Sequence, residues 1–207
     1  MTPFRVLRAR AVPIAIGMVD TDQIIPARFL KRPRGPDHAR LLFHDRRFAP
    51  DGAAIGGFPL DRPEFAGAAI MISADEFGTG SAREQAVWAL CAQGISCVLA
   101  PRFGAVFREN AIRNGLLPVA LPRDLIAALI AGIQARPAAV VVIDLPAQHV
   151  VDPVGAKHGF DIDPFEKLLL IEGLDELSFT SRNAGAIAAF ERAYADSYPW
   201  MAPRPKA

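Results

Sequence analysis

The segment from residue 68 to residue 121 constrains the fold most, because short apolar runs alternate there with helical patterns. Strands are expected over Ala68–Ser73, Ile95–Ala100 and Leu116–Leu121, and helices over about Ala82–Gln93 and Phe103–Asn114. A glycine follows each helix, where helices commonly end. Strands that alternate with helices of this length are typical of an α/β fold.

The remaining elements complete a mixed sheet with flanking helices. A strand-like opening run reaches Met18. Further elements are expected as a short helix in Leu41–Phe48, a helix near Asp124–Ala135, a strand over Ala139–Asp144, a strand pair ending near Ile162, and helices within Pro164–Ile171 and Arg182–Tyr194. Proline and glycine interrupt residues 27–67, which favours an irregular loop region. We therefore predict a single domain over residues 1–207 that ends in a helical tail.

A glycine-rich turn over Asp75–Ala86 carries the most chemistry. Its glycines, Gly78 and Gly80, let the backbone approach a ligand, and they deliver Ser81 and Arg83 to a predicted helix start. Helix-start amides and a guanidinium both favour an anion such as a carboxylate. A serine that caps an ordinary helix is the plain alternative. The turn lacks the third glycine of the dinucleotide fingerprint and the Gly-Lys-Ser/Thr of a P-loop, which excludes both.

The composition indicates a folded, cytoplasmic protein. Hydrophobic residues make up 51% of the chain and charged residues 22%, and a formal net charge of +1 gives no electrostatic case for nucleic acid or an anionic membrane. The basic start followed by apolar residues imitates a secretion signal, but Pro13, Asp20 and Asp22 favour a strand. No apolar run approaches the roughly 18 residues that span a bilayer. Cys91 and Cys97 lack metal-ligand spacing, so we expect two reduced core thiols and no metal site.

The serine of the turn fits a proton-transfer role better than a nucleophilic one. Gly-Thr-Gly-Ser-Ala departs from the Gly-x-Ser-x-Gly elbow of serine hydrolases, and none of the four histidines is obviously placed as a base. Arg83 would hold a substrate carboxylate, and Ser81 would exchange a proton on the adjacent carbon. A serine base needs a cation or a metal to stabilise it, and no metal site is visible in the sequence.

Several motifs together carry a resemblance to a known family. The first three are Val19–Pro26 (Val-Asp-Thr-Asp-Gln-Ile-Ile-Pro), Phe29–Lys31 (Phe-Leu-Lys) and Phe77–Glu84 (Phe-Gly-Thr-Gly-Ser-Ala-Arg-Glu). Further matches are Asn110–Pro118, Phe160–Phe165, Glu172–Glu176 and Ala186–Glu191. The combination covers most of the chain and resembles the small-subunit family of 3-isopropylmalate dehydratase, whose members have the aconitase-like swivel domain.

The resemblance implies a fold, an activity and a partner. The fold is a swivelling β/β/α domain of the aconitase C-terminal type, which closes over the substrate. A separate large subunit carries a four-iron four-sulfur cluster in this family, so this chain is expected to bind no cofactor itself and to be active only with that subunit. The implied hydro-lyase isomerises 2-isopropylmalate and 3-isopropylmalate, small dicarboxylates, through isopropylmaleate in leucine biosynthesis.

The resemblance also assigns roles to single residues. Ser81 is the base that exchanges the carbon-bound proton, and Arg83 binds a substrate carboxylate. Further substrate contacts are expected from Thr79, Gly80, Asp22, Phe29, Leu30 and Lys31. The last three belong to the loop that sorts substrates in this family, and its two apolar side chains suit an alkyl group. An arginine of this loop also contacts substrate in relatives, and the candidates here are Arg28, Arg32 and Arg34.

Two positions depart from the family's usual Gly-Ser-Ser-Arg-Glu-His-Ala. Ala82 replaces the second serine, and Gln85 replaces the histidine. A lost hydroxyl removes a hydrogen bond of roughly 0.5 to 1.5 kcal/mol. Two alternatives to the leading function therefore stay open. One is the small subunit of a related hydro-lyase for another substituted malate, such as a methylmalate or homocitrate, and the other is a non-catalytic swivel module that binds a carboxylate.

Overall fold

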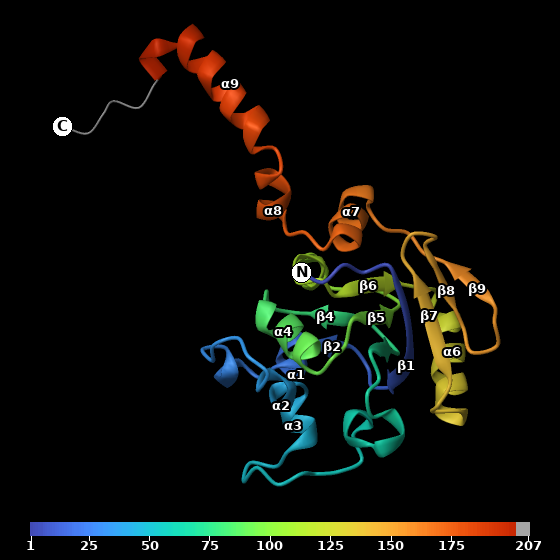
Figure 1. Ribbon diagram of the computed structural model, residues 1–207. Helices are drawn as coiled ribbons and strands as arrows, with labels where there is room; N and C mark the ends of the chain where they lie inside the picture. The colour runs from blue at the N-terminus through green and yellow to red at the C-terminus, as the bar shows by residue number, and fades with distance from the viewer. Residues whose placement is uncertain (202–207) are drawn as a thin grey trace.

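The core of the protein is a seven-stranded mixed sheet, which confirms the predicted α/β class (Figure 1). The computed structural model describes residues 1–201. The strands lie in the order β6-β5-β3-β1-β7-β8-β9. Their bounds are β1 Val6–Ile14, β3 Ile70–Ser73, β5 Cys97–Ala100, β6 Leu117–Ala120, β7 Val140–Asp144, β8 His149–Val151 and β9 Lys157–Gly159.

The long strand β1 joins two halves of this sheet. Its residues 11–14 pair in parallel with β3, and its residues 6–10 pair antiparallel with β7. β5 and β6 continue the parallel half, whereas β8 and β9 continue the other half as an antiparallel meander. Every residue of β3 and β5 is buried. Burial of this kind is typical of parallel strands, whose crossover helices cover the sheet.

Helices cover the parallel half and continue the chain beyond it. Their bounds are α4 Glu84–Ala92, α5 Ala105–Arg113, α6 Arg123–Ala135, α7 Pro164–Glu172, α8 Glu176–Ser181 and α9 Ala184–Ser197. α4 and α5 pack on each other, and α6 packs on β1, β3 and β5. α5 is tied to α7 by the two terminal guanidinium nitrogens of Arg108, which donate to the carboxylate of Glu166 at 2.7 and 2.6 Å.

Most predicted boundaries agree with the structure. Between residues 68 and 144, every predicted strand and helix lies within two residues of its predicted ends. The opening strand is shorter than predicted, because the chain leaves the sheet after Ile14 and bends at Gly17. The pair β8 and β9 ends at Gly159 instead of near Ile162. The short strand β4 (Phe77–Thr79) and the helix α8 were not predicted.

The irregular region contains only short helical turns. They are η1 Ala27–Phe29, α2 His38–Leu41, α3 His44–Arg47, η2 Pro59–Asp61 and η3 Pro63–Phe65. The short helix predicted in Leu41–Phe48 is present only over His44–Arg47, because Phe43 adopts a left-handed conformation with φ of +50° and separates α2 from α3. The Phe43 ring is fully buried, with its centroid 5.2 Å from that of Phe58, and its amide donates to the Ile24 carbonyl at 2.8 Å.

The chain continues after α7 as an arm that extends away from the sheet (Figure 1). The arm consists of α8, α9 and the turn η4 (Pro199–Met201). The sequence predicted one helix here, and the structure has two because α8 ends before Asn183. Residues 202–207 lie outside the described part of the chain, and the assignment of residues 1–207 to one domain stays a prediction.

Within residues 1–201, we find no helix with the combined length and apolar character that a bilayer crossing requires.

The strand β4 lies unusually close to the start of α5. The Phe77 amide donates to the Arg102 carbonyl and the Gly104 amide donates back to the Phe77 carbonyl, both at 3.0 Å. Gly78 has a φ of +73°, and a Cβ at this position would lie 2.2 Å from Cγ of Phe107. The backbone conformation and the close approach both require glycine at this position.

We expect Gly78→Ala to lower the free energy of unfolding by about 2 to 4 kcal/mol, because it adds left-handed strain and a steric clash with a buried ring. Gly132→Ala is the matched control, since Gly132 lies in α6 with open space around it. An alanine there is expected to be neutral or to stabilise by up to about 1 kcal/mol. Chemical denaturation followed by circular dichroism compares the two, and equal stabilities would contradict the close packing.

Candidate active site

Two motifs that are far apart in the sequence meet at a second, two-stranded sheet. β2 (Val19–Asp20) pairs in parallel with β4, with Val19 opposite Phe77 and Asp20 opposite Thr79. The Val19 amide donates to the Glu76 carbonyl at 2.8 Å. This pairing places the start of the Asp-Thr-Asp motif beside the glycine-rich turn, as a shared site requires.

The start of α1 (Thr21–Ile24) holds the turn in place. The buried Thr21 hydroxyl donates to the Ser81 carbonyl at 3.1 Å. Asp20 caps the helix by accepting a hydrogen bond from the Gln23 amide at 2.7 Å. Gly80 has a φ of +89°, a left-handed conformation that suits glycine. The backbone around Ser81 is therefore fixed by contacts from the first motif.

Ser81 does not cap the following helix. α4 begins at Glu84 with Arg83 in the N-cap position, so the predicted start at Ala82 is two residues too early, and Ser81 lies before the helix. The plain alternative for this serine, an ordinary helix cap, is thereby excluded. Ser81 is exposed, and no group within residues 1–201 forms a hydrogen bond with its hydroxyl. The hydroxyl is free to meet a ligand.

Arg83 forms an ion pair with Asp22, another residue predicted for the site. Arg83 Nη2 donates to Asp22 Oδ2 at 2.7 Å, and Nη1 contacts the second carboxylate oxygen. Nη1 also donates to the Ile25 carbonyl at 3.4 Å. The hydrogen bond from Arg83 is the main cause that lowers the pKa of Asp22. The Arg83 side chain is 11% exposed, whereas that of Asp22 is 57% exposed. A buried guanidinium fork thus faces an accessible carboxylate.

The predicted substrate-sorting loop lies beside α4. Gln85 Nε2 donates to the Leu30 carbonyl at 3.2 Å. Phe29 and Leu30 are half-buried, and Lys31 is exposed. The structure therefore brings the loop next to the turn through Gln85, one of the two positions that depart from the family pattern.

Two guanidinium groups and a histidine ring lie around the ring of Phe29. The guanidinium carbons of Arg28 and Arg32 lie 4.5 and 5.3 Å from the ring centroid, and the His44 ring lies 4.8 Å away between centroids. Arg34 instead lies over Trp88, at 5.5 Å from its ring centroid. Cation–π contacts of this kind hold the ring in one place.

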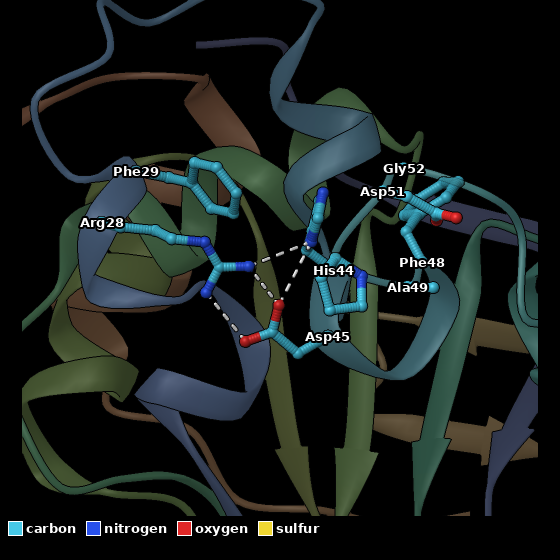
Figure 2. Close-up of a pocket in the computed structure, with 9 residues that line it drawn as sticks. Arg28, Phe29, His44, Asp45, Phe48, Ala49, Asp51 and Gly52 are labelled. Atoms are coloured by element: carbon cyan, nitrogen blue, oxygen red, sulfur yellow. Dashed lines mark hydrogen bonds and ion pairs between the residues drawn. The ribbon is translucent and has the colours of Figure 1, made fainter.

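A pocket of about 740 Å³ lies beside the loop at Arg28 and Phe29 (Figure 2). It is lined by Arg28, Phe29, His44, Asp45, Phe48, Ala49, Pro50, Asp51 and Gly52. Among the predicted site residues, Phe29 and the candidate loop arginine Arg28 line it, but Ser81 and Arg83 do not, so we do not place the chemistry of the serine in this pocket. Figure 2 shows Arg28 reaching across to Asp45 below Phe29.

Asp45 lines this pocket, although no feature of the sequence marked it as a candidate functional residue. Arg28 Nη1 donates to Asp45 Oδ2 at 2.9 Å, Arg28 Nη2 contacts the other oxygen, and His44 Nδ1 lies 3.2 Å from Oδ1. Hydrogen bonds from Arg28 are the main cause that lowers the pKa of Asp45 to about 2. The partners are 17 residues apart in an irregular region, and no sequence spacing links them.

An iron–sulfur cluster does not fit the donor groups of this chain. Such clusters are typically held by four cysteine thiolates, and the sequence has two cysteines. Cys97 is fully buried in β5, and burial raises the pKa of both the Cys97 and the Cys91 thiol. Within residues 1–201, no three His, Cys, Asp or Glu side chains group together as metal ligands would.

Comparisons with known proteins define the class first. A family model described as the Aconitase C-terminal domain matches residues 1–124, and one described as LeuD_N matches residues 127–164. A crystal structure of 3-isopropylmalate dehydratase from Methanocaldococcus jannaschii superposes with a TM-score of 0.65 at 25% identity. That match covers 89% of this chain and 99% of the other. The fold is therefore that of an aconitase C-terminal domain, as predicted.

Sequence relatives then define the family. The 3-isopropylmalate dehydratase small subunit of Caulobacter vibrioides is 43% identical over 202 residues, covering 97% of this chain and 99% of its own. The protein of the same name from Acidothermus cellulolyticus is 47% identical over 193 residues, covering 92% and 93%. The chain belongs to the family of 3-isopropylmalate dehydratase small subunits, and the predicted membership is confirmed.

The contact between Gln85 and Leu30 can be tested by hydrogen exchange. Gln85→Ala removes a hydrogen bond worth about 0.5 to 1.5 kcal/mol, so we expect the amides of residues 29–31 to exchange up to about tenfold faster. Gln134→Ala, an exposed glutamine on α6, is the control and is expected to leave these amides unchanged. Equal exchange in both variants would show that Gln85 does not hold the loop.

The ion pair of Asp45 gives a pH-dependent signal. The folded pKa lies near 2, below the ordinary value of 3.8, so the stability from this group is present above pH 3.8 and is lost as the pH falls toward 2. We expect a carbon NMR titration of the Asp45 carboxyl to have its midpoint near 2, and Arg28→Gln to move it up toward 3.8. Arg34→Gln should leave the midpoint in place. A midpoint near 3.8 in the unaltered protein would contradict the pairing.

Proposed function

We propose that this chain is the small subunit of a heteromeric 3-isopropylmalate dehydratase. With a large subunit that carries the iron–sulfur cluster, it would isomerise 2-isopropylmalate and 3-isopropylmalate through isopropylmaleate, as a cytoplasmic enzyme of leucine biosynthesis. One observation carries the proposal: an exposed serine hydroxyl lies two residues before an arginine whose fork already holds a carboxylate. Membership of the family supplies the reaction class.

Arg83 binds the substrate through exchange of one carboxylate for another. In the structure its guanidinium is paired with Asp22. A substrate carboxylate has the same planar geometry as the Asp22 side chain, and guanidinium matches it bidentately. Because the Asp22 side chain is largely exposed, it can swing into solvent without opening the core. Asp22 then lies at the edge of the occupied site, while the turn backbone of Thr79 and Gly80 borders the substrate.

Ser81 moves the proton. In its deprotonated form, Oγ takes the proton from the carbon beside the carboxylate, hydroxide leaves from the neighbouring carbon, and an alkene, a hydroxide ion and neutral Ser81 result. Hydroxide then adds to the carbon that lost the proton, Ser81 returns its proton to the other carbon, and the isomer and the deprotonated serine are formed. A nearby positive charge favours the deprotonated form of an acid, and Arg83 supplies such a charge two residues away.

The loop of residues 29–31 determines which substituted malate the enzyme accepts. Phe29 and Leu30 present half-buried apolar surface that suits the isopropyl group. The related hydro-lyase for another substituted malate is not favoured, because relatives of 37 to 47% identity over nearly the whole chain carry the isopropylmalate name. We assign no substrate contact to a particular loop arginine, since Arg28, Arg32 and Arg34 each have a partner within the chain.

The function is tested by hydration of isopropylmaleate under anaerobic conditions, with this chain and the cluster-loaded large subunit from the same genome. We expect turnover that requires both chains. An assembled complex that hydrates a methyl-substituted maleate and leaves isopropylmaleate untouched would overturn the substrate assignment. An assembled complex with no activity on any substituted maleate would favour a non-catalytic binding module.

We expect Ser81→Ala to lower kcat of the assembled complex by at least about 10²-fold, because general-base groups contribute about 10²- to 10⁴-fold. Assembly should be unchanged, since the Ser81 side chain forms no hydrogen bond within residues 1–201. Ala82→Ser is the matched control, which adds a hydroxyl one position away and is expected to keep activity. Near-normal kcat in the Ser81 variant would remove this serine from the chemistry.

A further inference from the structure

The C-terminal arm carries an uncovered apolar face. No residue of α9 is buried. Its exposed large side chains and those of the following turn are Ile187, Phe190, Tyr194, Tyr198, Trp200 and Met201, with Phe190 67% and Trp200 76% exposed. The first four are spaced by three or four residues, which places them on one side of a helix.

Neighbouring rings along the arm touch one another. Ring centroids lie 5.6 Å apart between Phe190 and Tyr194, 4.9 Å between Tyr194 and Tyr198, and 5.6 Å between Tyr198 and Trp200. The aromatic side chains therefore form one continuous strip. A helix of 14 residues is marginal in water on its own, and most of its stability comes from packing of its apolar face. This strip is consequently expected to be covered in the working protein.

The base of the arm is anchored to the body. Arg113 Nε donates to Glu176 Oε1 at 3.1 Å, which ties the end of α5 to α8. The ring of Phe179 meets that of Phe165 edge-on, with centroids 5.0 Å apart. Asp175 caps α8 by accepting a hydrogen bond from the Ser178 amide at 2.6 Å. The arm therefore leaves the body at a fixed place.

That place is continuous with the face that holds the candidate active site. Glu84, the residue after Arg83, accepts a hydrogen bond from Asn114 Nδ2 at 2.9 Å. Asn114 follows Arg113, the anchor of α8. The serine and arginine need a second chain to complete the reaction, so the partner must sit against this face. A partner seated there lies next to the base of the arm.

The charges of the arm point to a protein partner. Residues 176–201 contain two arginines, Arg182 and Arg192, and three acidic residues, Glu176, Glu191 and Asp196. Anionic membranes and nucleic acids select for clustered basic residues, which this helix lacks. Aromatic side chains on a nearly neutral helix match the composition of protein interface cores, where a helix lies in an apolar groove.

We propose that α8, α9 and η4, residues 176–201, form a docking arm that binds an apolar groove on the cluster-carrying large subunit. The inference rests on the proposed function for the identity of the partner. The arm adds an attachment outside the active site, so the two chains stay joined while the catalytic face opens and closes over the substrate.

The test is the affinity between the full-length chain and the large subunit, measured by calorimetry with a Phe190→Ala, Tyr194→Ala double variant. Alanine raises helix propensity, which offsets the loss of the ring contacts along α9, and circular dichroism of the free variant is expected to show unchanged helix content. We expect Kd to rise at least tenfold, because exposed aromatic anchors dominate interfaces of this kind. Val154→Ala, a 75% exposed residue between β8 and β9, is the control and should leave Kd unchanged.

Turnover at saturating large subunit separates the docking arm from the proposed function. We expect the double variant to recover near-normal kcat there, since the arm holds no residue of the candidate site. Unchanged Kd in the double variant would overturn the docking arm while leaving the function intact. Loss of self-association in sedimentation, with Kd unchanged, would also overturn it and assign the aromatic strip to a second copy of this chain.

Discussion

The parallel pairing of β2 with β4 is the constraint on which the candidate active site depends. Each strand has only two or three residues, yet their pairing joins segments about 60 positions apart. It is stabilised by the close approach of Gly78 to Phe107 on one side and by the Thr21 hydroxyl on the other. Without this pairing, Ser81 and Asp22 would lie on unconnected loops.

The pair between Arg83 and Asp22 gives the site its electrostatic character. The guanidinium is mostly buried, and an unpaired buried charge is costly, so the free subunit supplies its own carboxylate. This arrangement keeps the fork in a geometry that suits a carboxylate before substrate arrives. Binding then replaces the Asp22 carboxylate on Arg83 with a substrate carboxylate. Because Arg83 is already mostly desolvated in the free subunit, substrate binding needs little further desolvation of the guanidinium.

The sequence could predict most of the regular elements, but not how the residues of the candidate site meet. Helices such as α4 and α5 were placed to within two residues, because their periodicity and their terminal glycines are local signals. β2 and β4 are too short to show the alternation of apolar and polar residues that marks a strand. The break between α2 and α3 at Phe43 depends on burial of its ring against Phe58. The helix start was placed too early because Ala82 favours a helix and an arginine is not a residue that usually marks an N-cap. The partnership of Arg28 with Asp45 arises from tertiary structure alone, and the catalytic and binding roles themselves stay predictions.

A structure of the two-chain complex with bound isopropylmalate would test the exchange of carboxylates on Arg83 most directly. We expect the Arg83 guanidinium to have left Asp22 and to hold a substrate carboxylate through both terminal nitrogens, with Ser81 Oγ within hydrogen-bonding distance of the carbon that loses its proton. Phe29 and Leu30 should contact the isopropyl group. An intact pair between Arg83 and Asp22, with the substrate held by other residues, would contradict the proposed site.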